Sequence, residues 1–204
     1  MIDKNKTITI SGPPGSGTTT LAKILEKKTG IKHVYTGDIF RRLAREYGMS
    51  LDEFGKYCEK HSEIDRKLDE EQKKILKKGN VILEGRLAGW IAYKNRIPAF
   101  KVFLDADLDT RVKRVIKREG GDFQQRKKEI LDREKSERVI KREGGDFQQR
   151  KKEILDREKS EAKRYRSYYG FNPDDKSFYD VVIDSSDKKP EEIAKIVLDK
   201  LDEA

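Results

Sequence analysis

The sequence predicts an α/β fold with a parallel sheet, because short apolar segments alternate with longer helical patterns along the chain. Five segments are rich in β-branched or aromatic residues, as strands are: residues 7–10, 33–35, 81–83, 101–104 and 181–183. Strands that alternate with helices form βαβ units, which place helices on both faces of a parallel sheet. A length of 204 residues suits one domain with a substantial core, so we expect residues 1–204 to form a single domain.

A glycine-rich loop follows the first predicted strand. Residues 12–19 read GPPGSGTT, and the helical pattern LAKIL follows at residues 21–25. In this context the loop N–H groups and the helix N-terminus bind phosphate oxygens. The motif normally contains Gly-Lys-Ser/Thr, but residue 18 is Thr. The backbone cradle and the Mg²⁺-side hydroxyl of Thr19 are therefore present and the lysine is absent. A glycine-rich turn without a ligand is the alternative.

Polar residues follow the second and third predicted strands. Thr36 and Arg41 follow the second, where an acceptor phosphate or base would be held. Glu84 and Arg86 follow the third. An acidic residue at a strand end beside a phosphate loop can hold Mg²⁺ through water, and an arginine nearby can bind phosphate in a bidentate manner. An ion pair at the strand end is the alternative for Glu84 and Arg86.

Two charged helical regions, residues 38–79 and 109–169, are too long to be simple crossovers. We expect each to fold as a subdomain over the carboxyl edge of the sheet, where such folds bind ligands. In the first region Asp65 is a candidate acceptor for an exocyclic amine, and a solvated helix face explains it equally well.

The second region is dense in arginine. Arg114 and Arg118 lie four residues apart, and Arg157 and Arg164 lie seven apart, so each pair shares a helix face. Arginines that close over a triphosphate neutralise charge that develops during transfer and exclude water. Solvated helix faces are the alternative interpretation.

The same region contains an exact tandem repeat. Residues 114–137 read RVIKREGGDFQQRKKEILDREKSE, and residues 138–161 are identical. Repeat families diverge in sequence, so an exact copy indicates a recent duplication or engineering. We expect the outgoing half of the subdomain to come from the first copy and the returning half from the second. Arg157 in the second copy is followed seven residues later by Arg164, whereas Arg133, its counterpart in the first copy, is followed seven residues later by Ile140. The middle segment, residues 122–143, should project from the body or be mobile.

The amino-acid composition limits the kinds of partner that this chain is expected to bind. The net charge is +9, but basic and acidic residues are interleaved and Tyr165, Tyr168 and Tyr169 suit a helix packing face, so we expect no nucleic-acid partner. The single cysteine, Cys58, cannot form an internal disulfide, which favours a reducing cytoplasm. No apolar run reaches membrane-spanning length. We expect a monomer that binds no membrane.

These motifs together resemble the archaeal type of cytidylate kinase, within the nucleoside monophosphate kinases. The resemblance rests on SGPPGSGTTT, TGDIFR, EID, LEGRLAGW, VFLDA and REKSEAKRYRSYYG. It implies a P-loop nucleoside triphosphate hydrolase-like fold with a five-stranded parallel sheet, a monophosphate-binding subdomain at residues 38–79 and a lid at residues 109–169. The implied reaction transfers the γ-phosphoryl group of ATP to CMP or dCMP with Mg²⁺.

The motifs and the resemblance together assign the candidate residues. ATP would be bound by Gly12, Pro13, Pro14, Gly15, Ser16, Gly17, Thr18, Thr19 and Thr20. The monophosphate would be bound by Thr36, Arg41, Asp65 and Arg86, and Mg²⁺ by Thr19 and Glu84. The expected catalytic arginines are Arg86, Arg114, Arg118, Arg157 and Arg164, and one from the lid would replace the absent lysine.

Other functions remain open from the sequence. AMP or UMP is an alternative acceptor, because the spacing of the motifs does not separate purine from pyrimidine. A nucleotide-binding protein without catalysis is a second alternative, since the loop lacks its lysine and the lid region carries the repeat. A nucleic-acid-binding protein is the third.

Deleting either copy of the repeat produces the same chain, 24 residues shorter than the 204-residue protein. We expect this variant to fold at least as stably and to phosphorylate CMP at least as fast, because the core strands and the phosphate loop lie outside the repeat. Thermal unfolding and coupled ADP release would measure the two properties. Loss of the folding transition would contradict the expectation for the core, whereas slower turnover alone would contradict the expectation for the lid.

Overall fold

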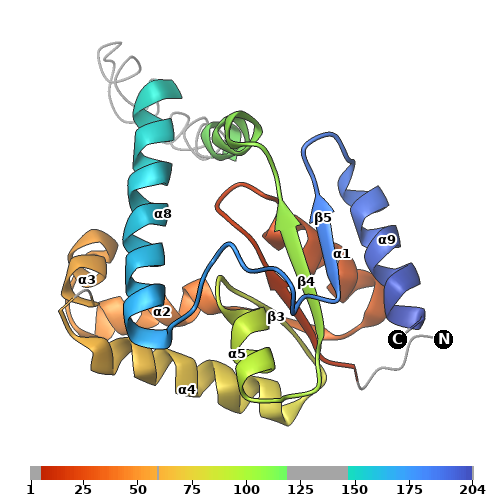
Figure 1. Ribbon diagram of the computed structural model, residues 1–204, viewed down its shortest axis with the longest axis horizontal. Helices are drawn as coiled ribbons and strands as arrows, with labels where there is room; N and C mark the ends of the chain where they lie inside the picture. Colours follow the sequence, from red (N-terminus) through yellow and green to blue (C-terminus); the bar gives the residue numbers. More distant parts are fainter. Residues whose placement is uncertain (1–5, 59, 119–146, 204) are drawn as a thin grey trace, which may run out of the picture.

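A computed structural model describes residues 6–58, 60–118 and 147–203. Its centre is a parallel sheet of five strands in the order β2-β3-β1-β4-β5 (Figure 1). The strands are β1 (Ile8–Ser11), β2 (Lys32–Tyr35), β3 (Val81–Glu84), β4 (Phe100–Asp105) and β5 (Val181–Asp184). The predicted α/β class is therefore confirmed. Compared with the predicted ranges, β1, β3, β4 and β5 end one residue later, and β2 and β4 begin one residue earlier.

The central strand β1 pairs with β3 on one side and with β4 on the other. Ile8 lies opposite Ile82 in one pairing and opposite Phe100 in the other. All residues of β1 and β3 are buried, as expected for strands covered on both faces. The edge strands β2 and β5 are only partly buried. The first predicted strand thus lies at the centre of the sheet, with its following loop at the carboxyl edge.

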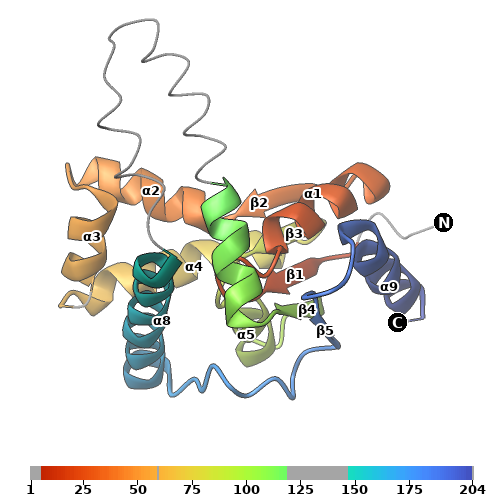
Figure 2. The same cartoon turned by 90° about the horizontal axis from the view of Figure 1, so that it is seen from above.

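Helices cover both faces of the sheet (Figures 1 and 2). They are α1 (Thr18–Thr29), α2 (Thr36–Glu46), α3 (Leu51–Cys58), α4 (Ser62–Lys78), α5 (Ala88–Lys94), α8 (Phe147–Tyr169) and α9 (Pro190–Asp202). Residues 108–118 are also helical. One core joins α1 and α9 to the sheet through residues such as Leu25 and Val197. A second core joins α5 and the end of α4 to the opposite face.

Helices α2, α3 and α4 form a subdomain with its own apolar centre. Phe54 of α3 is fully buried against Leu43 of α2 and Ile64 of α4. This arrangement corresponds to the subdomain predicted over residues 38–79, although α2 already begins at Thr36. Its helices lie beside the carboxyl ends of β2 and β3, so polar side chains of α2 and α4 can reach the end of the sheet (Figure 2).

The described parts of residues 109–169 are two helical segments that pack on each other. Val112 and Val115 of the first segment contact Ile154 of α8 in a small apolar cluster. The first copy of the repeat contributes residues 114–118 to this contact, and the second contributes residues 147–161. The segment predicted to project, residues 122–143, lies outside the described residues.

The carboxyl end of α8 is attached to the body by aromatic packing. Tyr165 packs near Phe171, with ring centroids 6.3 Å apart, and Phe171 stacks on Trp90 at 5.0 Å. Tyr168 lies three residues after Tyr165 on the same helix face and is 38% exposed. Among the described residues no helix is both long and apolar enough to cross a membrane.

Candidate active site

The loop after β1 adopts the backbone form that phosphate binding requires. Gly15 and Gly17 have φ angles of 83° and 97°, in the left-handed region that favours glycine. The next residue, Thr18, begins α1, so the loop leads directly into a helix N-terminus. Gly15 also lies against the helical segment at residues 108–118, where an added Cβ would be 2.5 Å from the carbonyl oxygen of Arg111. A side chain there would displace either the loop or that helix.

A buried carboxylate at the end of β3 holds the start of α1. The hydroxyl groups of Thr18 and Thr19 donate hydrogen bonds to Oε1 of Glu84 at 2.8 and 2.6 Å. Oε2 of Glu84 lies 2.9 Å from Nε2 of His33 on β2. Glu84 is 3% exposed, so these contacts replace water around its charge.

The glycine after Glu84 permits a close approach of α2. A Cβ at Gly85 would lie 2.3 Å from Oγ1 of Thr36, the first residue of α2. The Glu-Gly-Arg sequence therefore brings the acidic strand end, the start of α2 and Arg86 into one place. The sequence predicted that Thr36 and Glu84 lie at this edge, and the close contact at Gly85 explains the residue between Glu84 and Arg86.

A cavity of about 230 Å³ lies between the phosphate loop, the ends of β2 and β3, and helices α2, α4 and α8. Predicted site residues that line it are Gly12, Pro13, Pro14, Gly15, Thr18, Thr19, Thr36, Asp65, Glu84, Arg86, Arg118, Arg157 and Arg164. The structure thus brings together predicted site residues that are as far apart in the sequence as Gly12 and Arg164.

Five predicted residues do not line the cavity. Ser16, Gly17, Thr20, Arg41 and Arg114 are absent from the described cavity lining. Arg114 donates to the hydroxyl of Ser185 at 2.9 Å and to its carbonyl oxygen at 2.6 Å, in the loop after β5.

Arg41 and Ser16 each have a local role in this arrangement. Arg41 donates to Asp38 at 2.7 Å and lies over the ring of Tyr35. The carbonyl oxygen of Ser16 accepts a hydrogen bond from Ser185, while its side chain is fully buried behind the loop.

Glu161 of α8 lies between two of the cavity arginines. Its carboxylate oxygens are 2.9 Å from Nε of Arg157 and 3.4 Å from Nη1 of Arg86. Burial alone would raise the pKa of the Glu161 carboxyl, but the charges of Arg86 and Arg157 outweigh burial and hold that pKa below its ordinary value. Glu161 therefore stays ionised and neutralises part of the positive charge that faces the cavity.

Polar groups on α4 and α8 lack hydrogen-bond partners within the described part of the chain. They are Oδ2 of Asp65, Oε1 of Gln72, and Nε and Nη1 of Arg164. Nη1 of Arg164 is 3.8 Å from Oδ1 of Asp65, which is too far for a hydrogen bond. Burial raises the pKa of the Asp65 carboxyl, and Arg164 opposes that rise only in part. Buried groups left unpaired cost about 1–3 kcal/mol each, so their gathering in one cavity indicates a ligand site.

Three residues of this site were missed from the sequence. Glu161 lies four residues after Arg157, and Gln72 lies seven after Asp65, so helical spacing gave a usable signal for both. His33 is in a predicted strand of three residues, where alternation is too short to show which side chain points inward.

Comparison with known proteins identifies the family. The model of the cytidylate kinase-like family matches residues 7–139. The chain belongs to this family. Cytidylate kinase of Methanocaldococcus jannaschii is 42% identical over 196 residues, which cover 96% of this chain and 97% of that protein. Cytidylate kinase of Pyrococcus horikoshii is 43% identical over 198 residues, with coverage of 96% and 89%.

Solved structures support the same fold at low identity. Gluconokinase of Sinorhizobium meliloti superposes with a TM-score of 0.58 at 10% identity, covering 98% of this chain and 93% of that one. Shikimate kinase of Bacteroides thetaiotaomicron gives 0.57 at 16% identity and covers 97% of each chain. The predicted P-loop kinase fold is confirmed, and membership of the cytidylate kinase-like family makes the chain a phosphotransferase with a phosphate group as acceptor.

The oxygen atoms at the loop fit the Mg²⁺ ion that kinases use. Within the described residues no group of three or more His, Cys, Asp and Glu side chains could hold a metal. Mg²⁺ in kinases is usually held by one or two protein oxygens, substrate phosphates and water. The hydroxyl of Thr19 and the carboxylate of Glu84, 2.6 Å apart, provide that donor set. The ion would neutralise charge on the transferred phosphoryl group.

The repeat supplies a matched control for Arg157, one of the two arginines of α8 that line the cavity. Arg157 lines the cavity, whereas its identical counterpart in the first copy, Arg133, lies outside the described residues. We expect Arg157→Glu to remove about 2–5 kcal/mol of transition-state stabilisation, because it replaces a cation by an anion beside Glu161. Arg133→Glu should change kcat/KM far less. A larger loss from Arg133→Glu would mean that the first copy supplies the working residue.

Proposed function

We propose that this chain transfers the γ-phosphoryl group of ATP to CMP or dCMP, giving ADP and CDP or dCDP. The observation that carries the proposal is the cavity, which joins a phosphate loop to buried, unpaired base-recognition groups. The family to which the chain belongs contains relatives named cytidylate kinase, and the geometry of the cavity is consistent with their chemistry.

On the donor side, we assign the ATP phosphates to the loop. Backbone N–H groups of residues 12–19 and the N-terminus of α1 would bind the phosphate oxygens. Ser16, Gly17 and Thr20 lie outside the described cavity lining, so their contribution would come from the backbone. Thr19 and Glu84 would hold Mg²⁺ with its water.

On the acceptor side, Arg86 and Thr36 would bind the phosphate of the monophosphate. Both line the cavity next to Glu84. Arg41 would join them only after exchanging its present bond to Asp38 for the phosphate. A nucleotide phosphate carries more charge than one carboxylate and offers more acceptor oxygens, which favours that exchange.

The base would lie among the unpaired groups of α4 and α8. Cytosine has an exocyclic amine that can donate to Oδ2 of Asp65. Its ring nitrogen and carbonyl oxygen are acceptors that suit the donors of Arg164. Uracil presents a carbonyl oxygen where cytosine has the amine, so it would face the carboxylate of Asp65 with no donor.

Catalysis would rest on positioning and charge neutralisation. An oxygen of the acceptor phosphate attacks the γ-phosphorus, the bond to the β,γ-bridging oxygen breaks, and ADP leaves with that electron pair. Arg86, Arg118, Arg157 and Arg164 line the cavity and would stabilise the charge on the transferred group. Arg118 or Arg157 would replace the lysine absent at position 18. Arg114, bound to Ser185, would act in catalysis only if it moved.

The function is tested by coupled ADP release with CMP, dCMP, AMP and UMP in turn. We expect CMP or dCMP to give the highest kcat/KM. Equal rates with AMP would contradict the cytidylate assignment. Binding of ATP without turnover on any monophosphate would select the nucleotide-binding alternative, for which the absent lysine is the supporting observation.

Asp65→Asn tests recognition of the base. We expect kcat/KM for CMP to fall about 10- to 100-fold, the value of a hydrogen bond to a charged group, while UMP loses little or gains. An asparagine can present its amide N–H groups to the uracil carbonyl. The matched control is Glu70→Gln on the exposed side of the same helix. Equal losses for CMP and UMP would place Asp65 in a structural role only.

A further inference from the structure

Position 18 holds a hydroxyl where phosphate loops usually hold a lysine, and that hydroxyl is bonded. Thr18 Oγ1 lies 2.8 Å from Oε1 of Glu84, and Thr19 Oγ1 lies 2.6 Å from the same oxygen. His33 Nε2 lies 2.9 Å from the second oxygen, Oε2. Two neighbouring residues of the first turn of α1 and one residue of β2 therefore converge on one carboxylate.

The chemistry of these groups fixes the direction of each hydrogen bond. An ionised carboxylate only accepts, so Thr18, Thr19 and His33 must each donate a proton. The hydroxyl proton of Thr19 then points at Glu84, and its lone pairs point away. The second hydrogen-bonding position of Oε1 is filled by Thr18. Among the described residues, these three donors hold both oxygens of the carboxylate.

The imidazole is itself held in place. The side chain of His33 is 10% exposed, and that of Glu84 is 4% exposed. The backbone N–H of His33 donates to Oε1 of Glu26 at 2.8 Å, and His33 lies opposite Ile82 in the pairing of β2 with β3. The ring is thus positioned by an edge strand and by α1, and it supports Glu84 from the side opposite the loop.

We propose that Thr18 and His33 are positioning residues that hold the Glu84 carboxylate, so that Thr19 presents its lone pairs to a metal–nucleotide complex. This inference rests on the proposed phosphoryl transfer. It explains what Thr18 does in place of a lysine: it orients the metal-side group, while an arginine supplies the lost charge. Groups that orient a metal ligand typically change metal affinity 10- to 100-fold when removed.

The test measures metal binding directly. Mn²⁺, as a probe for the Mg²⁺ site, is titrated by electron paramagnetic resonance into the full chain with ADP, and ADP binding without metal is measured by calorimetry. We expect His33→Leu and Thr18→Val each to weaken Mn²⁺ binding to the ADP complex about 10-fold. ADP alone should bind within about twofold of the parent, because the backbone cradle is intact. Thr18→Ser and His33→Gln, which keep a donor, should restore most of the affinity.

The chain's second histidine is the matched control. His61 also contacts a carboxylate, with Nδ1 2.9 Å from Glu63, but it is partly exposed and does not line the cavity. His61→Leu should leave Mn²⁺ and ADP binding unchanged. Unchanged Mn²⁺ affinity in both His33→Leu and Thr18→Val would overturn the proposal, as would equal losses of metal-free ADP binding.

A second readout separates this inference from the proposed function. Nitrogen-15 spectra of the two histidine rings in the nucleotide-free chain should show His33 protonated at Nε2, with His33→Gln assigning the signal. A ring protonated only at Nδ1 would overturn the positioning role even in an active kinase. An Nε2-protonated ring with normal Mn²⁺–ADP binding, in a chain that phosphorylates no monophosphate, would instead overturn the proposed function.

Discussion

The pairing of β1 with both β3 and β4 is the constraint on which the site depends. Ile10 lies opposite Glu84 in one pairing, and Ser11 lies opposite Phe103 in the other. Because parallel strands end at the same edge of the sheet, the phosphate loop emerges directly beside Glu84. The first turn of α1 can then donate two hydroxyl groups to that carboxylate. Strand, loop and helix are fixed to one another before any ligand is present, so the phosphate-binding half of the cavity is formed in advance.

The other half of the cavity is less complete without a ligand. Arg86 and Arg157 share one carboxylate, that of Glu161, while Arg164 and Asp65 approach each other without forming a hydrogen bond. Buried charge in this condition lowers stability, because the groups have left water without gaining full partners. The packing of α8 against the body holds them there. A phosphate and a polar base would supply the missing partners, so binding energy on this side would come from groups that folding leaves unsatisfied.

Local patterns in the sequence predicted which residues lie at the phosphate loop and the end of β3. They did not predict the hydrogen-bond partner of a side chain when that partner lies far away in the sequence. Parallel strands end at the same edge of the sheet, which is why the position of Glu84 beside the phosphate loop was predictable. Arg114 shares a helix face with the cavity arginine Arg118, yet it donates to the carbonyl of Ser185, which lies in the loop after β5. Nothing near Arg114 in the sequence encodes that partner.

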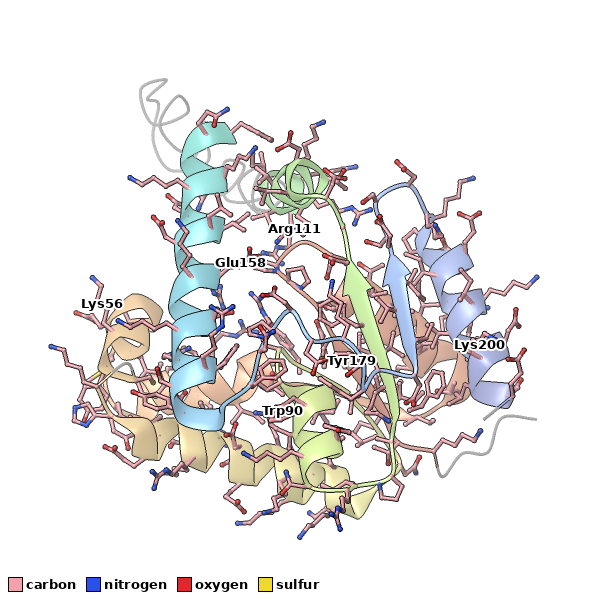
Figure 3. All side chains as sticks on the ribbon, viewed as in Figure 1. Lys56, Trp90, Arg111, Glu158, Tyr179 and Lys200 are labelled. Carbon is pink, nitrogen blue, oxygen red and sulfur yellow. The ribbon has the colours of Figure 1, made fainter. Side chains whose placement is uncertain are left out.

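The tandem repeat shows how identical sequences acquire different surroundings. Within the described residues, three ion pairs connect unduplicated residues to the second copy: Lys151 with Asp109, Glu158 with Arg111, and Glu161 with Arg86. The side chains of Glu158 and Arg111 point toward one another in Figure 3. The first copy contains the same lysine and glutamates, so these ion pairs cannot decide between the copies. The continuity of the chain does decide between them. Only the second copy continues within one helix to Tyr165, whose ring packs against the aromatic cluster of the body. Because α8 is attached to the body at Tyr165, the residues of α8 that line the cavity before it must come from the second copy, although the first copy has the same sequence.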